Sequence, residues 1–336
     1  MFLAKPTKSN DMSRVVDLEL GVAYVITDLH GEAEPYMRYR DHFLSLHAGG
    51  HADFLVILGD LIHGYGNAED DASLELVLDV IRLQNELGAG AVVMVLGNHE
   101  FPHIYGVTLS KGSMEFTSRF ESSLGPDRSR VVEFFKSLPF FVRTAGGTLL
   151  THAGAVASVA NADIAALITE FSHDKLLAEA ERLMSSPDVR DLIGTYMNMT
   201  PDEYDSAARH FLAVSGESDP RYLDLLRGLI ASNLHEWQMI WDYLFNQCEA
   251  GVSQGFYRKV VERYLACYSS NDWPQRAMVT GHIAARNGFE IITNLHLRLA
   301  SWAHSTPKEA GRYLMFDVAQ PVQSAHDLTG QIHALR

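Results

Sequence analysis

The segment FLVILGDLIHGYG, residues 54–66, contains the pattern that decides the fold. Its apolar run, which is of strand type, ends abruptly at Gly59-Asp60, and His63 follows three residues later. A buried strand that ends in a polar group is typical of a parallel sheet whose loops carry function. Glycine beside the carboxylate lets chain and ligand approach closely, because no side chain intervenes. The segment therefore predicts a functional group at the end of a strand.

Four further apolar runs repeat this pattern: VAYVITDLHGE, AVVMVLGNHE, GTLLTHAG and RAMVTGHIA. Helical patterns at about 35–46 and 73–87 separate the first three strands, which indicates a β-α-β-α-β start with parallel strands. Right-handed crossovers bring the ends of such strands to one edge of the sheet. The polar residues expected at that edge are Asp28, His30, Asp60, Asn98, His99, His152 and His282.

Over residues 161–268 the spacing of apolar residues becomes typical of helices. It is clearest in YLDLLRGLIASNLHEWQMIWDYLF, where apolar residues recur at spacings of three and four. We interpret this stripe as a helix packed on the core rather than as a cofactor or partner groove. After Met278 the short runs FEIIT, LHLRLASW and RYLMFDV indicate a second, partly antiparallel sheet.

No linker, repeat or low-complexity tract divides the sequence. We therefore predict one α/β domain, residues 1–336, built as a two-sheet β-sandwich flanked by helices. A helical insertion or cap is expected within it at about 155–275, where it would stand over the site and set substrate size.

Composition excludes several classes of function. The chain has 42 acidic and 27 basic residues and a net charge of −15, so neither nucleic acid nor an anionic membrane is expected as a partner. It has no apolar run of the roughly 20 residues that a membrane helix needs, and residues 1–21 lack the apolar core of a secretion signal. We expect a cytoplasmic protein. Its two cysteines, Cys248 and Cys267, are interpreted as buried thiols.

The residues at the strand ends supply two carboxylates, one amide oxygen and four imidazoles. Such a mixed oxygen and nitrogen set suits Mn, Fe or Zn rather than Ca or a thiolate site. A single histidine after a strand is more often a hydrogen-bonded core or loop residue. Five coincident strand ends favour a metal centre instead.

The motifs DLHGE, GDLIHG, GNHE, THAG and TGH resemble, in order and spacing, those of the calcineurin-like metallophosphoesterases, over residues 22–318. FFKSLPFFVRTAGGTLLTHAG and MIWDYL resemble the phosphoprotein phosphatase branch. Ala284 stands where other branches carry the second His of G-H-x-H, which supports the same branch. The resemblance implies a four-layer αββα fold and a metal-dependent phosphatase, a phosphoric ester hydrolase.

The resemblance also implies roles for the strand-end residues. Two metal ions (Mn, Fe or Zn) would share the Asp60 carboxylate, and a hydroxide that bridges them would attack phosphorus directly. His99 would protonate the leaving oxygen as general acid. The implied ligands are Asp28, His30 and Asp60 for one ion, and Asp60, Asn98, His152 and His282 for the other.

The sequence departs from the branch after Asp60. Where the branch reads G-D-x-x-D-R-G, this chain has His63 and Gly64 in place of the second Asp and the Arg. His63 could orient His99, contact phosphate as an imidazolium, or only cap the loop. Residues that could orient His99 instead are Glu100, Asp70 and Asp71. Residues that could replace the arginine at the phosphate are Arg258 and Arg286, for which a surface salt bridge is the alternative.

These features predict hydrolysis of phosphomonoesters, with phosphoprotein (Ser/Thr or Tyr) as the first substrate class. The alternatives are a nucleotide or dinucleoside polyphosphate hydrolase, and a non-catalytic phosphate-binding protein of the same fold. RNA is disfavoured by the charge of −15 and by the lack of any Lys or Arg run.

Overall fold

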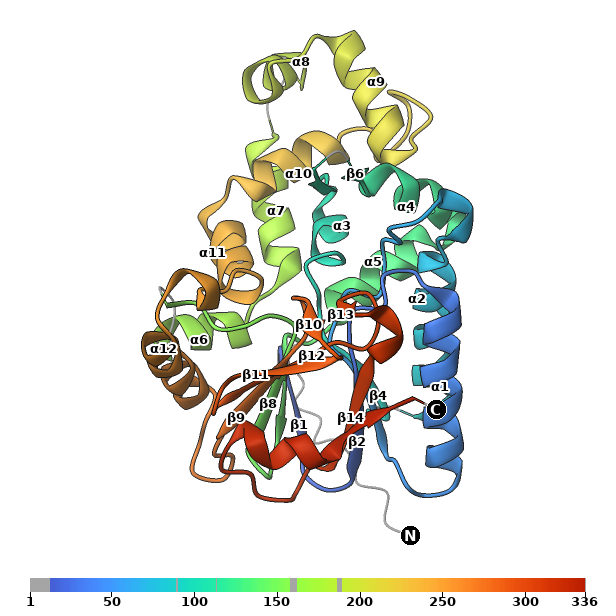
Figure 1. Ribbon diagram of the computed structural model, residues 1–336. Helices are drawn as coiled ribbons and strands as arrows, with labels where there is room; N and C mark the ends of the chain where they lie inside the picture. Colours follow the sequence, from blue (N-terminus) through green and yellow to red (C-terminus); the bar gives the residue numbers. More distant parts are fainter. Residues whose placement is uncertain (1–12, 89, 113, 158–161, 186–188, 336) are drawn as a thin grey trace. The chain divides into compact units, whose positions relative to one another are not determined.

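The apolar run that ends before Asp60 forms strand β3 (Phe54–Ile57) in the computed structural model (Figure 1). The structure describes residues 13–88, 90–112, 114–157, 162–185 and 189–335. Strand β3 pairs in parallel with β2 (Val22–Ile26) and β4 (Val92–Met94). Helices α1 (Ala33–Ala48) and α2 (Ser73–Leu87) connect the three strands. The predicted β-α-β-α-β start is confirmed.

Two sheets contain most of the strands. The first has the order β15-β14-β2-β3-β4, in which β14 (Arg312–Asp317) and β15 (Ile332–Ala334) run antiparallel to their neighbours. The second has the order β1-β7-β8-β9-β12-β11 and mixes parallel and antiparallel pairs, which confirms the prediction of a partly antiparallel second sheet. Its strands are β1 (Val15–Leu18), β7 (Phe141–Thr144), β8 (Thr148–Thr151), β9 (Ala277–Thr280), β11 (Phe289–Thr293) and β12 (His296–Leu299).

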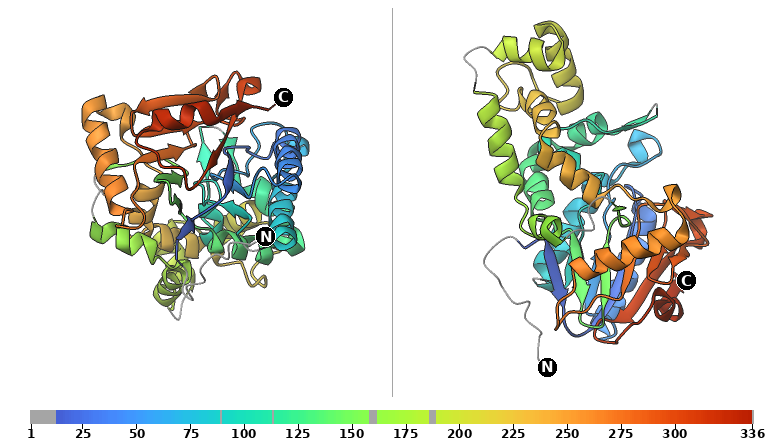
Figure 2. Two further views of the ribbon diagram at one scale, coloured as in Figure 1. Left: turned by 90° about the horizontal axis from the view of Figure 1, so that it is seen from below. Right: turned by 90° about the vertical axis from the view of Figure 1, so that its left-hand side faces the viewer.

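One hydrophobic core joins the two sheets. Val25 and Val56 of the first sheet pack in the same buried cluster as Leu150 and Val279 of the second. Each such side chain contributes about 1.5 to 3 kcal/mol when it leaves water, so the face-to-face packing of the sheets is a main source of stability. Helices α1 and α2 lie on one side of the sheets and α12 (Gln254–Cys267) on the other, as Figures 1 and 2 show. The predicted β-sandwich flanked by helices is confirmed.

The chain forms two compact units. Unit 1 comprises residues 1–98, 138–171 and 242–336 and contains both sheets. It also contains α6 (Ala162–Thr169), the short pair β10 (Ala285–Arg286) and β13 (Ser305–Thr306), and the 3₁₀ helices η1 (Ala68–Asp70), η5 (Glu249–Gly251), η6 (Lys308–Ala310) and η7 (Ala325–Gln331).

Unit 2 comprises residues 99–137 and 172–241 and is mainly helical. It shares 172–241 with the predicted insertion, whereas 99–137 lie outside the predicted bounds and α12 belongs to unit 1. The division into one domain with an insertion at 155–275 stays a prediction. The elements of unit 2 are α3 (Phe101–Tyr105), β5 (Ser110–Lys111), β6 (Met114–Glu115), α4 (Thr117–Leu124), η2 (Gly125–Asp127), α5 (Arg128–Ser137), α7 (His173–Leu183), α8 (Val189–Leu192), η4 (Ile193–Met197), α9 (Pro201–Leu212), α10 (Asp224–Ser232) and most of α11 (His235–Leu244).

The amphipathic stripe of residues 222–245 forms two helices, α10 and α11, rather than one. Ser232 Oγ and Asn233 Nδ2 both donate to the Leu229 carbonyl, at 2.9 and 2.8 Å. Side chains that bond back to the helix in this way compete with its own hydrogen bonds, which explains the break. Ile230 and Trp237 are buried, and the Trp237 ring stacks on Trp241 at 5.2 Å. The stripe therefore packs in a core, as we interpreted it.

Two expectations from composition can be compared with the described residues. Among them, no helix combines the length and the apolar character needed to cross a membrane. Cys248 and Cys267 were predicted to be buried, but both are only partly buried. Burial raises the pKa of both thiols, which lowers their reactivity. Residues 1–12, part of the stretch judged to lack a secretion signal, lie outside the described residues.

Candidate metal centre

The predicted polar residues follow the carboxyl ends of neighbouring strands of unit 1. Asp28 and His30 follow β2, Asp60 follows β3, and Asn98 lies four residues after β4. In the second sheet, His152 follows β8 and His282 follows β9. Parallel neighbours in each sheet place such ends at one edge. This topology brings residues that are far apart in the sequence into one site.

Several of these residues have a left-handed backbone. Among the described residues, only eight other than glycine have a positive φ, and five of them are site residues predicted from the sequence. Such conformations cost about 1 to 3 kcal/mol each and persist where the surrounding structure holds them, often at functional sites. The five are Asp28 (52°), His30 (45°), Asp60 (51°), His63 (72°) and His282 (69°).

Backbone hydrogen bonds join the loops after β2 and β3. The amide of His30 donates to the Asp60 carbonyl at 3.0 Å, and that of Gly31 donates to Leu61 at 2.8 Å. Gly59 is required by close approach, because a Cβ there would lie 2.8 Å from both Gly97 Cα and His152 Nδ1. The close approach of the chain at the glycine beside Asp60 thus agrees with the steric reason given from the sequence, while the approach of a ligand there stays a prediction.

The first group of donor atoms comprises Asp28, His30 and His304, whose ligand atoms lie within 4.8 Å of one another. Asp28 and His30 are fully buried, and Nε2 of His30 lies 3.7 Å from Oδ2 of Asp60. His304 was not predicted, because it stands five residues after the end of β12 rather than in a recognised motif. The strand-end rule applied to LHLRLASWAH could have found it.

The second group comprises Asp60, His152 and His282, with Asn98 beside them. His152 Nε2 lies 3.4 Å from Asp60 Oδ2, 2.9 Å from Asn98 Oδ1 and 3.1 Å from His282 Nδ1. Tetrahedral ligands at 2.0 to 2.1 Å from an ion are about 3.4 Å apart, so these spacings suit the coordination shell of one cation. The donor set fits a metal ion of the Mn, Fe or Zn type.

The histidine rings are oriented by carbonyl groups behind them. Nδ1 of His152 donates to the Leu58 carbonyl at 2.6 Å, and Nδ1 of His30 donates to the Ile62 carbonyl at 3.2 Å. In the neutral form of each ring, this bond places the proton on Nδ1 and makes Nε2 the nitrogen that could bind a metal ion. The loop that begins at Asp60 therefore contains the carbonyl group that orients His30 beside the Asp60 carboxylate.

The buried carboxyl and imidazole groups of the site differ in the direction of their pKa shifts. Burial raises the pKa of Asp28, but the charges of His304 and His152 outweigh it and leave the pKa at about 2. Burial lowers the pKa of His30 and of His282 to about 4. Burial also disfavours charge on His152, yet Asp60 and Asp28 raise its pKa to about 9. A cation bound here would displace protons that the carboxylates otherwise attract.

The remaining predicted residues have other surroundings. His99 is the first residue of unit 2, where its ring lies 5.3 Å from that of Phe116. The amide of His63 donates to Ser73 Oγ at 2.8 Å, and its side chain is buried. The roles assigned to His99 and His63 stay predictions. Arg258 pairs with Glu262 at 3.0 Å on α12, which is the surface salt bridge we gave as the alternative.

Arg286 is exposed at the end of β10, and its contact with phosphate stays a prediction. The carboxylate of Asp71 accepts hydrogen bonds from Ser73 N at 3.1 Å and Gly64 N at 3.2 Å, so it shapes the loop that follows Asp60. Asp70 accepts one from Asn67 Nδ2 at 3.2 Å. These contacts hold the loop after Asp60 in place.

Tyr65 is a further residue at the site that the sequence did not indicate. Its ring lies 4.7 Å from that of His30, and it is partly exposed. Burial and then the charges of Asp60 and Asp28 raise the pKa of its hydroxyl, so that hydroxyl stays protonated and can donate a hydrogen bond.

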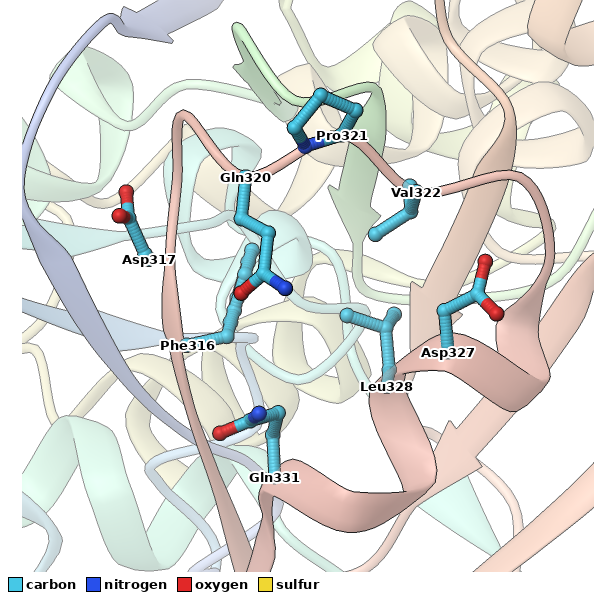
Figure 3. Close-up of a pocket in the computed structure, with 8 residues that line it drawn as sticks. All are labelled: Phe316, Asp317, Gln320, Pro321, Val322, Asp327, Leu328 and Gln331. Atoms are coloured by element: carbon cyan, nitrogen blue, oxygen red, sulfur yellow. The ribbon is translucent and has the colours of Figure 1, made fainter.

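A small pocket lies elsewhere in unit 1, beside β14 and η7 (Figure 3). Its Asp327 carboxylate accepts hydrogen bonds from the amides of Gln323 and Ser324, at 2.7 and 3.0 Å. This carboxylate therefore caps a turn, and the pocket contains none of the predicted site residues. The lining residues are Phe316, Asp317, Gln320, Pro321, Val322, Asp327, Leu328 and Gln331.

Solved structures resemble the chain at low sequence identity. A cold-active protein tyrosine phosphatase is 12% identical, with 91% of this chain and 76% of that chain covered and a TM-score of 0.49. A protein serine/threonine phosphatase from Saccharomyces cerevisiae is 14% identical, with 90% and 76% covered and a TM-score of 0.47. A metallophosphoesterase from Sphaerobacter thermophilus is 13% identical, with 93% and 92% covered and a TM-score of 0.37. No curated protein sequence matches.

The family is established by the sequence itself. The model of the calcineurin-like phosphoesterases matches residues 22–247, about two thirds of the chain. The matched range includes Asp28, Asp60, Asn98 and His152, and the geometry above places these residues in one site. The chain belongs to the calcineurin-like phosphoesterase family, and it is a metal-dependent phosphatase.

Proposed function

We propose that the chain hydrolyses phosphomonoesters, with phosphoproteins as the substrate class, at two metal ions held by unit 1. The observation that carries this proposal is the position of Asp60. Its Oδ2 lies 3.7 Å from Nε2 of His30 and 3.4 Å from Nε2 of His152, so one carboxylate stands between both groups of donors. A shared carboxylate is what two neighbouring cations need to offset their mutual repulsion.

Each site residue has a distinct part in this proposal. Bound ions would supply the Lewis acidity that phosphoester hydrolysis requires. Asp28 and Asp60 provide the negative charge that holds them, and Asn98 adds a neutral oxygen, which keeps the site cationic enough to attract a phosphate dianion. His99, which directly follows Asn98, would protonate the leaving oxygen.

The net charge of the chain supports the proposed substrate class, and the loop after Asp60 bears on how phosphate is bound. A net charge of −15 disfavours long polyanions such as RNA, whereas a phosphomonoester on a protein carries a single dianionic group. The family arginine is absent at Gly64, and the protonated hydroxyl of Tyr65 beside His30 supplies a neutral donor at the site. A neutral donor is weaker than the bidentate arginine that the branch uses for phosphate.

The test is hydrolysis of p-nitrophenyl phosphate by the full chain. Activity should require Mn²⁺, Fe²⁺ or Zn²⁺ and disappear with a chelator. Bis(p-nitrophenyl) phosphate, a diester, should react at least about tenfold more slowly. If two ions bind per chain and no metal supports hydrolysis, the chain is a phosphate-binding protein and the proposal fails.

A second comparison tests the substrate class. Phosphoserine, phosphothreonine and phosphotyrosine peptides should be hydrolysed with a higher kcat/KM than diadenosine tetraphosphate or a nucleotide. The reverse order would assign the chain to nucleotide or dinucleoside polyphosphate hydrolysis and would overturn the phosphoprotein proposal while leaving the metal site intact.

A further inference from the structure

Hydrogen bonds join the loop that carries His304 to Thr27 and Asp28. We call the site of the ion assigned to Asp28, His30 and Asp60 the first metal position, and that of the other ion the second. The loop lies between strands β12 and β13 and receives a hydrogen bond from Thr27 N to Ser301 Oγ at 3.0 Å. The amide of Ala303 donates to the Asp28 carbonyl at 3.1 Å. The His304 carbonyl in turn accepts from Ala285 N at 2.9 Å. The backbone on both sides of the His304 side chain is therefore fixed against Asp28 and β10.

The side chain of His304 points at the predicted ligands. Its Nδ1 lies 3.2 Å from Oδ1 of Asp28, and its ring centre lies 5.1 Å from that of His30. The side chain is only 15% exposed. One donor atom each from His304, Asp28 and His30 lies within 4.8 Å of the other two, a limit that the donor atoms of Asp60, His152 and His282 also meet.

His304 Nδ1 is buried and lies close to Asp28 Oδ1, at a separation that also occurs between two ligands of one ion. Two ligands of one cation approach each other in this way, because the lone pair of the imidazole nitrogen is aimed at the ion and not at the neighbouring ligand. Tetrahedral coordination would leave them about 3.4 Å apart.

The ligand sets of the two positions are unequal without His304. The first set implied by the resemblance has two carboxylates and one imidazole, from Asp28, Asp60 and His30. The second has one carboxylate, one amide oxygen and two imidazoles. Addition of His304 gives each position two oxygen and two nitrogen donors.

We infer that His304 is a fourth protein ligand of the first metal position. The inference rests on the proposed function, because it requires that a metal pair binds at Asp60. Its chemical consequence concerns metal preference. A second imidazole favours Zn, Fe or Co over Mn and Mg at the first position, since imidazole is a better ligand for the former ions. The two positions then select similar metals.

Titration of the metal-free full chain with Co²⁺ tests the inference by visible absorption and elemental analysis. Wild type should bind two ions. His304→Ala should bind one ion with unchanged affinity and the other at least about tenfold more weakly, with altered absorption bands for that ion. His304→Asp, which replaces the imidazole nitrogen with a carboxylate oxygen, should bind two ions and have a higher relative affinity for Mn²⁺. His326→Ala, at an exposed histidine of η7, is the matched control.

The outcomes separate the inference from the function on which it rests. If wild type binds two ions and His304→Ala binds both with wild-type affinity and an unchanged spectrum, His304 is not a ligand. If wild type binds no ions at Asp60, the proposed function fails first.

A measurement on wild type covers the case in which the variants do not fold. In protein loaded with ¹¹³Cd, scalar coupling reports direct bonds between the metal and histidine rings. Coupling to four rings, from His30, His152, His282 and His304, supports the inference. Coupling to the first three alone overturns it.

Discussion

Each of the two units contains a buried cluster of charged side chains, and the partners of the carboxylates differ between them. In unit 1, Asp28 and Asp60 face histidines. In unit 2, the buried Glu121 accepts from Arg128 Nε at 2.8 Å and from His103 Nδ1 at 3.0 Å, and it lies 3.4 Å from Arg221. The nearby Asp224 pairs with Arg227 at 2.8 Å.

The difference in partners gives the clusters different chemistry. Arginine keeps its charge at every relevant pH and binds a carboxylate through several donors, so the Glu121 cluster is already compensated. Histidine can give up its proton and present a lone pair, so the Asp60 cluster can accept a cation instead. The backbone agrees: no residue of the Glu121 cluster is among the described residues with a positive φ. A carboxylate with arginine partners is structural, whereas one with histidine partners is open to a metal.

The largest effect is expected for Asp60→Asn. Removal of the shared charge should lower metal occupancy at both positions and reduce kcat by about a thousandfold or more, since metals supply several kcal/mol of transition-state stabilisation. Elemental analysis and hydrolysis of p-nitrophenyl phosphate measure the two effects. The exposed Asp272→Asn is the control. Unchanged metal content in the Asp60 variant would show that this carboxylate does not join the two positions.

Next in size is the effect of Glu121→Ala on stability. It leaves the partly exposed guanidinium groups of Arg128 and Arg221 without their buried carboxylate. The free energy of unfolding should fall by about 2 to 4 kcal/mol, less than for a fully buried pair because both guanidinium groups regain some water. Urea denaturation measures the loss. Metal content should stay at the wild-type level. Glu133→Gln, which changes an exposed carboxylate paired with Lys136, should change stability little. Loss of metal from the Glu121 variant would contradict the contrast between the clusters.

His99→Ala tests the general-acid role that the resemblance implies for this histidine. The variant should keep its metals and slow hydrolysis of substrates with poor leaving groups by about a hundredfold. Substrates with activated leaving groups, such as p-nitrophenyl phosphate, should be slowed much less, because they need no proton. Equal slowing of both substrates would remove His99 from the acid role.

A smaller effect concerns the pH dependence of stability. His296 is fully buried, and burial lowers its pKa to about 3. The unfolded chain binds a proton at this histidine below about pH 6.5 and the folded chain does not, so the contribution is complete above pH 6.5 and is lost as the pH falls towards 3. Between pH 7 and pH 5 the loss should be about 2 kcal/mol.

His296→Gln should remove this part of the pH dependence, as measured by urea denaturation of the metal-free protein at both pH values. Its hydrogen bonds to Tyr257 and Thr280, at 3.0 and 2.8 Å, are with neutral hydroxyls, so an uncharged amide can replace the ring in part. His326→Gln is the exposed control. The same pH dependence in the His296 variant as in wild type would contradict the assignment.

Local patterns in the sequence predicted much of unit 1. The alternation of apolar strands with polar ends, as at Ile57-Asp60, depends only on neighbouring residues and on the rule that parallel strand ends share an edge. The positions of Asp28, Asp60 and His152 at one site followed from it. His304 was missed although it also follows a strand, because it stands five residues after the end of β12 and its place at the site is set by hydrogen bonds of its loop to Thr27 and Asp28.

Unit 2 was harder to predict. The segment of residues 99–137 contains short helices such as α3, with five residues, whose periodicity is too brief to read. Residues 99–137 contact the later helices of unit 2 through pairs such as Glu121 with Arg221, which lie 100 residues apart in the sequence. The break between α10 and α11 arises from side-chain hydrogen bonds of Ser232 and Asn233, which compete with an otherwise continuous apolar stripe.

The most direct test is anomalous diffraction from crystals of the zinc-loaded full chain. We predict two zinc peaks about 3.5 to 4 Å apart, with the Asp60 carboxylate bonded to both. A single peak, or peaks bonded to different residues with Asp60 bonded to neither, would contradict the account.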